Sequence, residues 1–240
     1  MSFTLECMKI RRTGFVPAFV GGGLISAAVP VLDMVFRSEI YVGRDSSPVE
    51  ILLSANWQMM AMLNILLVVT GACIMYNAEY ADNAFQRICA LPTTQSAMFF
   101  AKAVVMTVTG IMLLAIEACS VFYCSAYWFG QSTSLYAEVP AHFVFLFLLM
   151  LPAVMVSLLI ASACKNMWIS LGIGVLCIFA ATMLPAQNFI MSLFPFALPF
   201  QTLSGKGVDV ISYYVAACLA EIVVIGALEV VFLKVRRSFE

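Results

Sequence analysis

Three glutamates lie inside long apolar runs of the sequence: Glu117, Glu221 and Glu229. If such runs cross a bilayer, an ionisable side chain costs on the order of 3 kcal/mol and usually faces a protein interior or a cavity. Glu221 and Glu229 are eight residues apart, which places them on roughly one helix face. One interpretation is a polar pathway that attracts a cationic substrate. The other is hydrogen bonding between helices through protonated carboxyl groups and, for Glu229, proximity to the basic C-terminal end.

Other residue types that carry chemistry do not form a recognisable site. His142 is the single histidine and opens an apolar run, with Glu138 as the acid near it, so we expect an imidazole at the water boundary rather than a catalytic base. The eight cysteines form no CxxC pair and no Cys/His cluster, which favours buried thiols over a metal centre. We therefore predict no catalytic residue, no metal site and no cofactor bound by this chain.

The composition places these residues in a membrane protein. Of the 240 residues, 63% are hydrophobic and 10% are charged, whereas a typical soluble domain has roughly 25% charged residues. Runs of about 20 apolar residues predict helices that cross a bilayer. We expect an all-α integral membrane protein, with one transmembrane domain over residues 1–240. Its six spans are expected at 14–36, 53–76, 97–125, 142–163, 169–184 and 208–233.

The distribution of charge predicts the orientation. Nine of the twelve Lys and Arg side chains fall on one side of the six spans, so both termini and the loop 77–96 should be cytoplasmic. A net charge of −1 argues against a nucleic-acid partner. Residues 1–13 are weakly amphipathic and predict an interfacial helix, with a simple polar leader as the alternative. Trp57, near the start of the second span, fits the aromatic belt at the membrane surface.

The segment 185–207 is apolar but too broken to cross the membrane. It contains Pro185, Pro195 and Pro199, and the pieces between them are shorter than a span. We expect one or two re-entrant or interfacial helical pieces that pack on protein, on the extracellular side between the fifth and sixth spans.

The loop 77–96 contains the pattern of a short amphipathic helix. Asp82 or Asn83 can cap its start, and Pro92 stops it after Leu91. One face of this helix is apolar and comprises Ala81, Ala84, Phe85 and Ile88. Because such a helix is connected to a span at each end, a partner protein that binds it can move both spans. The alternative is a helix that lies on the membrane surface without a partner.

The residues around this loop resemble the intracellular loop of ABC-2 type permeases. The resemblance rests on Glu79, Arg87, the Leu91-Pro92 step and Lys102 at the foot of the third span. It extends over the chain through the amphipathic N-terminus, the six spans, the broken segment and the basic C-terminal end. The length and the Leu193–Phe200 segment look most like the permease subunits of lantibiotic (bacteriocin) immunity transporters. The resemblance implies the fold of an ABC-2 permease, similar to type V exporters.

The resemblance also implies partners. The chain has no GxxxxGKS or GxxxxGKT motif, so ATP and Mg would be bound and hydrolysed by a separate ABC ATPase subunit. Residues 79–91 would be the coupling helix, with Phe85 and Ile88 as apolar anchors and Arg87 and Glu79 as polar contacts. The residues assigned to coupling are Glu79, Asp82, Phe85, Arg87, Ile88, Leu91 and Pro92. A second permease, identical or homologous, is expected to complete the pathway.

The function implied is that of a bacterial plasma-membrane exporter. With its ATPase, the permease would remove a lantibiotic-like or other amphipathic peptide from the membrane and confer self-immunity. Two alternatives stay open. One is an ABC-2 exporter of a drug, lipid or polysaccharide, and the other is a membrane module that binds peptide or partners without transport.

Overall fold

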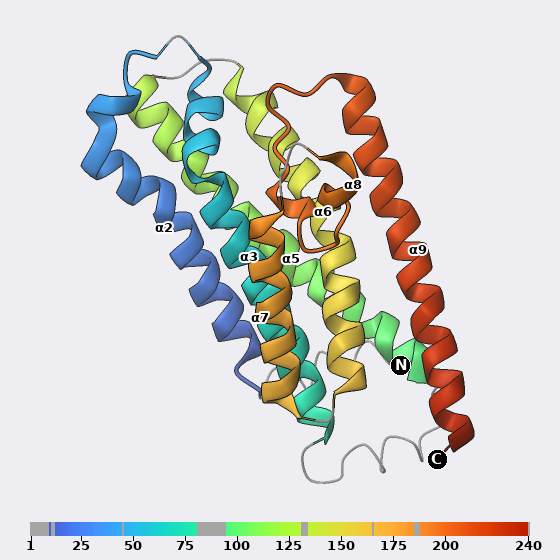
Figure 1. Cartoon of the computed structure of the whole chain (residues 1–240). Coiled ribbons are helices and arrows are strands. Elements are labelled where there is room, and N and C mark those ends of the chain that lie inside the picture. Colours follow the sequence, from blue (N-terminus) through green and yellow to red (C-terminus); the bar gives the residue numbers. More distant parts are fainter. Residues whose placement is uncertain are drawn as a thin grey trace.

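The structure is a computed structural model that describes residues 10, 13–44, 46–80, 95–130, 134–164, 166–184 and 188–239, with only the backbone described for residues 95 and 234–239. Within these residues the regular structure is helical (Figure 1). In chain order the helices are α2 (Phe15–Tyr41), α3 (Pro48–Tyr80), α5 (Gln95–Phe129), α6 (Leu135–Ala163), α7 (Met167–Met183), α8 (Phe189–Ser192), the short 3-10 helix η2 (Leu198–Phe200) and α9 (Val208–Phe239).

The long helices form one elongated bundle with two distinct ends (Figure 1). At one end α3 and α6 finish and α5 and α7 begin, and α9 also ends there; we name it the Glu79 end. At the opposite end are the connections from α2 to α3 and from α5 to α6, together with the start of α9; we name it the Lys206 end. The predicted interfacial helix at 1–13 lies outside the described residues, except for Ile10 and Thr13.

Five helices, α2, α3, α5, α6 and α9, are long and apolar enough to cross a membrane. The predicted span 169–184 falls on α7, which has 17 residues. At 1.5 Å per residue it is about 25 Å long, slightly less than the ~30 Å hydrocarbon core of a bilayer. The structure thus supports five spans by length, and a sixth through α7 stays a prediction.

The helices are longer than the spans expected from the apolar runs. α3 has 33 residues and continues through Tyr80, so the first four residues of the 77–96 loop are helical. α5 has 35 residues and continues to Phe129, after which Gly130 has a φ of 83°. Glycine adopts this left-handed conformation without the steric cost that other residues incur, and it commonly follows a helix end.

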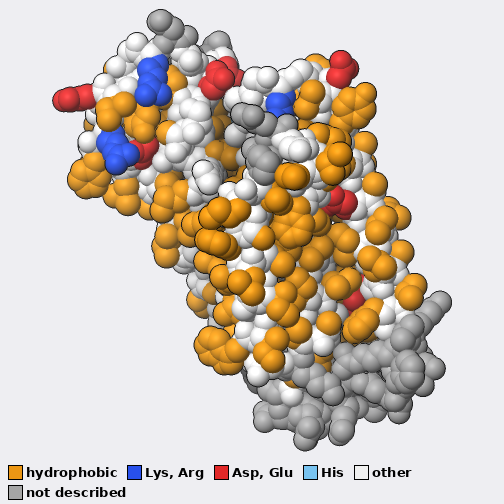
Figure 2. All heavy atoms as spheres, in the orientation of Figure 1, with side chains coloured by type: hydrophobic (Ala, Val, Ile, Leu, Met, Phe, Trp, Pro, Cys, Tyr) orange, Lys and Arg blue, Asp and Glu red, His pale blue; other side chains and the backbone are white. Residues whose placement is uncertain are grey.

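The two central helices are α3 and α6. In each of them, 61% of the most apolar stretch is buried within the chain, compared with 22% in α9. α3 packs against α2, α5, α6 and α7, whereas α9 contacts mainly α6. Figure 2 shows a broad hydrophobic surface along the middle of the bundle, with Lys and Arg side chains at the Lys206 end. This surface is suited to lipid or to another apolar chain.

Glycines allow two of the closest helix contacts. A Cβ atom added to Gly174 of α7 would lie 2.3 Å from Cγ1 of Val69 in α3. A Cβ atom on Gly22 of α2 would lie the same 2.3 Å from Cδ2 of Leu67. Small residues of this kind permit the close backbone approach on which helix association in membranes depends.

The segment between α7 and α9 folds back into the bundle and contains α8 and η2 (Figure 1). Phe196 and Leu198 are fully buried there. The indole nitrogen of Trp57 donates a 3.1 Å hydrogen bond to the carbonyl oxygen of Pro199. Trp57 is only 3% exposed, so its placement in the aromatic belt was wrong. Its N–H finds an acceptor inside the protein rather than at the membrane surface.

Candidate coupling site

A buried ion pair closes the base of the loop between α3 and α5. Glu79 lies in the last turn of α3 and Lys102 in the second turn of α5. The Lys102 Nζ atom is 2.6 Å from Oε1 of Glu79, and the two side chains are 1% and 4% exposed. Lys102 Nζ also lies 5.0 Å from the centre of the Tyr76 ring. The short Glu79–Lys102 contact and the face of the Tyr76 ring both offset the cost of removing the two charges from water.

Hydrogen bonds at the same end of the bundle connect α3 to two more helices. The hydroxyl of Tyr80, the last residue of α3, donates to the carbonyl oxygen of Ser162 in α6 at 2.6 Å. The Ser162 hydroxyl in turn donates to Oε2 of Glu229 in α9 at 3.3 Å. Both Ser162 and Glu229 are buried. The polar contacts of the Glu79 end therefore join α3 to α5, and α3 through α6 to α9; we name these residues the Glu79 network.

The network brackets the predicted coupling helix. Glu79 is the one predicted coupling residue within the described part of the chain, and its carboxylate is directed to Lys102. The others, Asp82, Phe85, Arg87, Ile88, Leu91 and Pro92, lie outside the described residues, and their contacts with an ATPase stay predictions. α3 and α5 flank residues 81–94, and the ion pair joins these two helix ends to each other.

A second polar group lies deeper in the bundle, around Glu117. This glutamate of α5 is fully buried, as are Asn64 of α3 and Ser26 of α2. Asn64 Nδ2 donates a 3.0 Å hydrogen bond to Glu117 Oε2. Among the described residues, the Oε1 atom of Glu117 and the Oδ1 atom of Asn64 have no hydrogen-bond partner. A protonated carboxyl would add a donor here, which favours the helix-to-helix interpretation of Glu117.

The three intramembrane glutamates do not form one pathway. Glu117 lies with Asn64, and Glu229 lies with Ser162 in the Glu79 network. Glu221 is half-buried on α9, and its Oε2 atom has no hydrogen-bond partner among the described residues. Of the three, Glu221 is the one that is half-buried as a residue, although its Oε2 atom is itself buried. The sequence did not identify Asn64 or Ser162, although an asparagine inside an apolar run is a signal of a buried polar partner.

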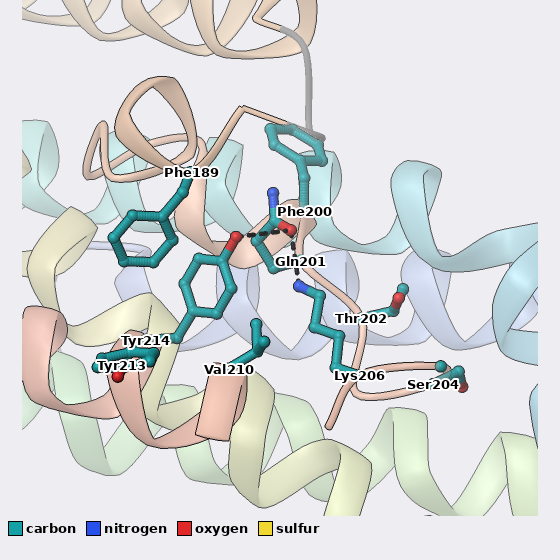
Figure 3. Close-up of a pocket in the computed structure, with 10 residues that line it drawn as sticks. Phe189, Phe200, Gln201, Thr202, Ser204, Lys206, Val210, Tyr213 and Tyr214 are labelled. Atoms are coloured by element: carbon teal, nitrogen blue, oxygen red, sulfur yellow. Dashed lines mark hydrogen bonds between the residues drawn. The ribbon is translucent and has the colours of Figure 1, made fainter. Parts of the chain in front are cut away.

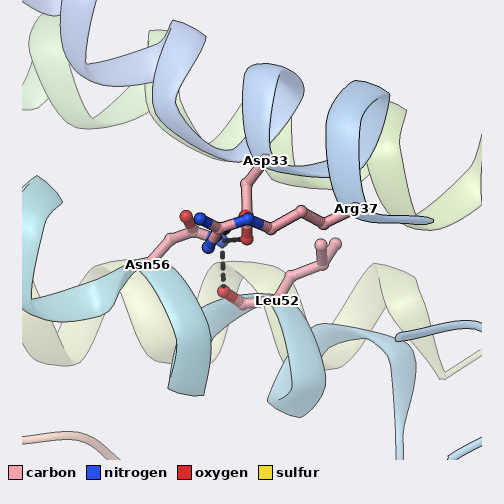
Figure 4. A network of polar contacts seen from close by, with 4 residues as sticks. All are labelled: Asp33, Arg37, Leu52 and Asn56. Atoms are coloured by element: carbon pink, nitrogen blue, oxygen red, sulfur yellow. Dashed lines mark hydrogen bonds and ion pairs between the residues drawn. The ribbon is translucent and has the colours of Figure 1, made fainter. Parts of the chain in front are cut away.

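Three further polar contacts lie at the Lys206 end. Asn56 Nδ2 donates to Asp33 Oδ2 at 3.1 Å and to the Leu52 carbonyl at 3.0 Å, and Arg37 Nη1 lies 3.8 Å from Asp33 Oδ1 (Figure 4). The helical dihedral angles of α2 are interrupted at Arg37, with φ −135° and ψ 20°. The bond from Asn56 to Asp33 joins α3 to α2, whereas the other two contacts lie within α3 and within α2.

His142 joins α6 to the segment before α9. Its Nδ1 atom is 2.8 Å from the Glu138 carbonyl oxygen and its Nε2 atom is 3.1 Å from the Ser204 hydroxyl. A carbonyl can only accept, so Nδ1 carries the proton and Nε2 accepts from Ser204. With both ring nitrogens bonded and 8% of the residue exposed, His142 is a structural tether.

Comparison with protein families places the chain among transporters. The sequence model of the ABC-2 family transporter protein matches residues 2–181, which is most of the chain, so the protein belongs to this family. No curated protein and no solved structure matches it. The predicted likeness to ABC-2 permeases is confirmed. The chain is the membrane-spanning, non-catalytic permease component of an ABC transporter, and the family implies an ABC ATPase partner.

Proposed function

We propose that this permease works with an ATPase subunit to export a lantibiotic-like or other amphipathic peptide from the membrane, and thereby confers immunity on the cell that makes the peptide. The observation that carries the mechanism is the Glu79 network. It connects the segment where the family places its ATPase contact to four of the long helices.

In this proposal the Glu79 end is cytoplasmic, α7 completes six spans, and both termini lie inside a bacterial plasma membrane. The ATPase binds residues 79–91 as a coupling helix, with Phe85 and Ile88 as apolar anchors and Arg87 as a polar contact. Glu79 acts from within the bundle. Its ion pair with Lys102 holds α3 and α5 together, so ATP-driven movement of the coupling helix moves both helices as a unit.

The remaining contacts carry this movement further. The hydrogen bond from Tyr80 to Ser162 transmits the movement of α3 to the end of α6, and the bond from Ser162 to Glu229 transmits it to α9. Among the described long helices α9 contacts mainly α6, while its first turns pack on the folded-back segment through Tyr214. A shift at the end of α6 therefore tilts α9 and changes the lipid-facing surface through which an amphipathic peptide would enter.

A second permease subunit, identical or homologous, completes the pathway in this proposal. Much of the surface of α2 and α9 is apolar and exposed, including Leu24, Ile25, Val223 and Leu228. This supports a partner on at least one of these helices, with lipid on the rest. Glu221, half-buried on α9, is placed to attract a cationic peptide.

The test is a purification of the tagged protein from its native membrane in mild detergent, followed by mass spectrometry and an ATPase assay. We expect an ATP-binding subunit and a second permease to copurify, and cationic lantibiotics to stimulate ATP hydrolysis. Stimulation by a drug, lipid or polysaccharide instead would transfer the assignment to another ABC-2 substrate. A lone protein, under conditions that keep a control ABC complex intact, would favour a non-transporting module.

A further inference from the structure

A cavity of about 770 Å³ lies at the Lys206 end, between the folded-back segment and the first turns of α9. Six residues define its chemistry: Phe189, Phe200, Gln201, Lys206, Tyr213 and Tyr214 (Figure 3). Its size is within the range of cavities that hold small molecules, roughly 300–1,000 Å³. We name it the Lys206 pocket.

Lys206 is the cation of this pocket. Its Nζ atom donates to Oε1 of Gln201 at 2.7 Å and lies 4.3 Å from the centre of the Tyr214 ring. In the described part of the chain no carboxylate forms an ion pair with it. Asp209, the nearest acid in sequence, is exposed and does not line the cavity. An ammonium group has three N–H donors, so after the bond to Gln201 two of them are available to a ligand.

Partial burial lowers the pKa of Lys206 to about 8. Removal from water penalises the charged form of a lysine. At neutral pH most of the amine still carries its proton. A ligand that brings a negative charge would therefore relieve an existing cost of burying this cation.

The wall beside Lys206 is held in place before any ligand arrives. Gln201 and Tyr214 are 4% and 3% exposed, and the Tyr214 hydroxyl lies 3.4 Å from Gln201 Oε1 and 2.9 Å from the Ser192 hydroxyl. The Phe189 ring packs at 5.3 Å from the ring of Tyr214. Such preorganisation reduces the entropy lost on binding.

The rim of the pocket is apolar and exposed. Tyr213 is 63% exposed and Val208 is 82% exposed on α9, and Ile190 of α8 is 80% exposed. Of these three, Tyr213 lines the pocket, and Val208 and Ile190 are close in sequence to its lining residues Val210 and Phe189. Aromatic rings next to a basic group are typical of the boundary between hydrocarbon and lipid headgroups.

We propose that the Lys206 pocket binds the headgroup of an anionic phospholipid. Lys206 would donate to the phosphate, while Phe189, Phe200 and Tyr213 would contact the glycerol and the first carbons of the acyl chains. Basic pockets of membrane proteins bind acidic lipid headgroups in this way. The quaternary ammonium of phosphatidylcholine would be repelled by Lys206, so the pocket should prefer phosphatidylglycerol. This site is separate from peptide export and does not depend on it.

The experiment is native mass spectrometry of the full-length protein, purified with its accompanying subunits and titrated with phosphatidylglycerol, phosphatidylcholine or glycerol phosphate. We expect the wild type to bind phosphatidylglycerol best. Lys206→Gln should weaken that binding about fivefold. Lys206→Arg should restore it because arginine keeps the charge. The matched control is Arg44→Gln, which removes an exposed cation that lies over Tyr41, outside the pocket, and should leave the affinity within about twofold.

Three results would overturn the proposal. The first is equal affinity of the wild type and Lys206→Gln for phosphatidylglycerol. The second is equal affinity of the wild type for the two lipids. The third is glycerol phosphate binding as tightly as the lipid, which would make the pocket a site for small soluble anions. If Lys206→Gln fails to fold, Tyr213→Ala tests the same site through an exposed side chain and should weaken binding of the lipid more than binding of glycerol phosphate, which has no acyl chains; equal affinity of the wild type and Tyr213→Ala for the lipid would then overturn the proposal.

Discussion

The ammonium nitrogen of Lys102 lies 2.6 Å from Oε1 of Glu79, and this contact joins the start of α5 to the end of α3. These are the last charged residue before the segment 81–94 and the first one after it. Almost all of their surface is buried, so the pair cannot be separated cheaply. An ion pair in this place makes the two helix ends a single mechanical unit.

Breaking one half of this pair should be strongly destabilising. We expect Glu79→Gln or Lys102→Met to lower stability by about 3–5 kcal/mol, because each leaves an uncompensated buried charge or dipole. The double variant Glu79→Gln/Lys102→Met should recover much of the loss. Thermal unfolding in detergent of the wild type, the two single variants and the double variant gives the interaction energy. Additive losses would show that the two side chains act independently.

Substitutions in the proposed coupling helix should act on the complex rather than on the fold. We expect Phe85→Asp or Arg87→Glu to abolish copurification of the ATPase and peptide-stimulated hydrolysis, because they remove an apolar anchor or reverse a contact charge. The melting temperature of the permease should stay within a few degrees of the wild type. If the complex and peptide resistance both survive Phe85→Asp, residues 79–91 are not the ATPase contact.

Glu221 and Glu117 should differ in their effect on peptide protection. Glu221→Gln removes the charge of a half-buried residue that, in the proposed function, attracts a cationic peptide, and should reduce protection about threefold, the effect of a modest charge interaction. Glu117→Gln is its matched control, because the amide oxygen still accepts from Asn64 and the site is fully buried. The measurement is the growth-inhibitory concentration of a cationic lantibiotic. Equal protection in the wild type and Glu221→Gln across the titration would give Glu221 a structural role.

Alanine substitutions at two glycines of α7 test the contact between α3 and α7. Gly174→Ala should lower stability by about 1–3 kcal/mol, because its Cβ would overlap the Val69 side chain and force repacking. Gly172→Ala is the control, since a Cβ there meets nothing within 4 Å and alanine has the higher helix propensity. Melting temperatures should fall for the first variant and hold or rise for the second. The opposite order would mean that α7 packs differently.

Binding of phosphatidylglycerol should weaken as the pH rises through about 8. The pKa of Lys206 is lowered to about 8 by burial, so the cation is lost well below the pH at which an exposed lysine loses it. Other titratable groups near the pocket are Tyr213, Tyr214 and Asp209, with His142 behind Ser204. Lys206→Arg controls for all of them, since its charge persists over this range. A wild-type affinity that is constant from pH 7 to 9.5 would contradict the assignment.

The lowered pKa of Lys206 also makes the stability of the folded protein depend on pH. A lysine whose folded pKa lies below its unfolded value binds fewer protons in the folded state between those two values, so the protein gains stability as the pH rises from about 8 toward 10.5. Lys206→Gln should lack this gain. Because the side chain is half-exposed, solvent screening keeps the effect modest.

The apolar runs of the sequence predict the long helices. The resemblance to ABC-2 permeases includes Glu79 and Lys102, but as two separate residues. The sequence does not predict their pairing, because Glu79 lies two positions before the segment 81–94 and Lys102 lies eight positions after it, so no symmetric spacing relates them. Helix ends were harder to place. Asn77 to Tyr80 look like a polar loop, but Glu79 and Tyr80 continue the helix because partners on α5 and α6 satisfy their side chains.

Contacts that depend on the packing of distant helices could not be predicted. Asn64 reaches Glu117, 53 residues away, and no local pattern fixes the rotation of α3 against α5. Trp57 has the composition of an interfacial residue, yet it is buried, since the folded-back segment supplies a carbonyl acceptor. The shortness of α7 is visible in the sequence, because the predicted span 169–184 is the shortest of the six and the helix has 17 residues.

The hydrogen bond from Trp57 to Pro199 spans 142 positions of the chain, and this has a consequence for biosynthesis. A ribosome makes and releases α3 long before it reaches the proline that accepts this bond. Until then the indole N–H sits in a membrane without its native acceptor, next to an incomplete core. The place between α3 and α6 where η2 packs therefore gains its native occupant only after Pro199 has been synthesised.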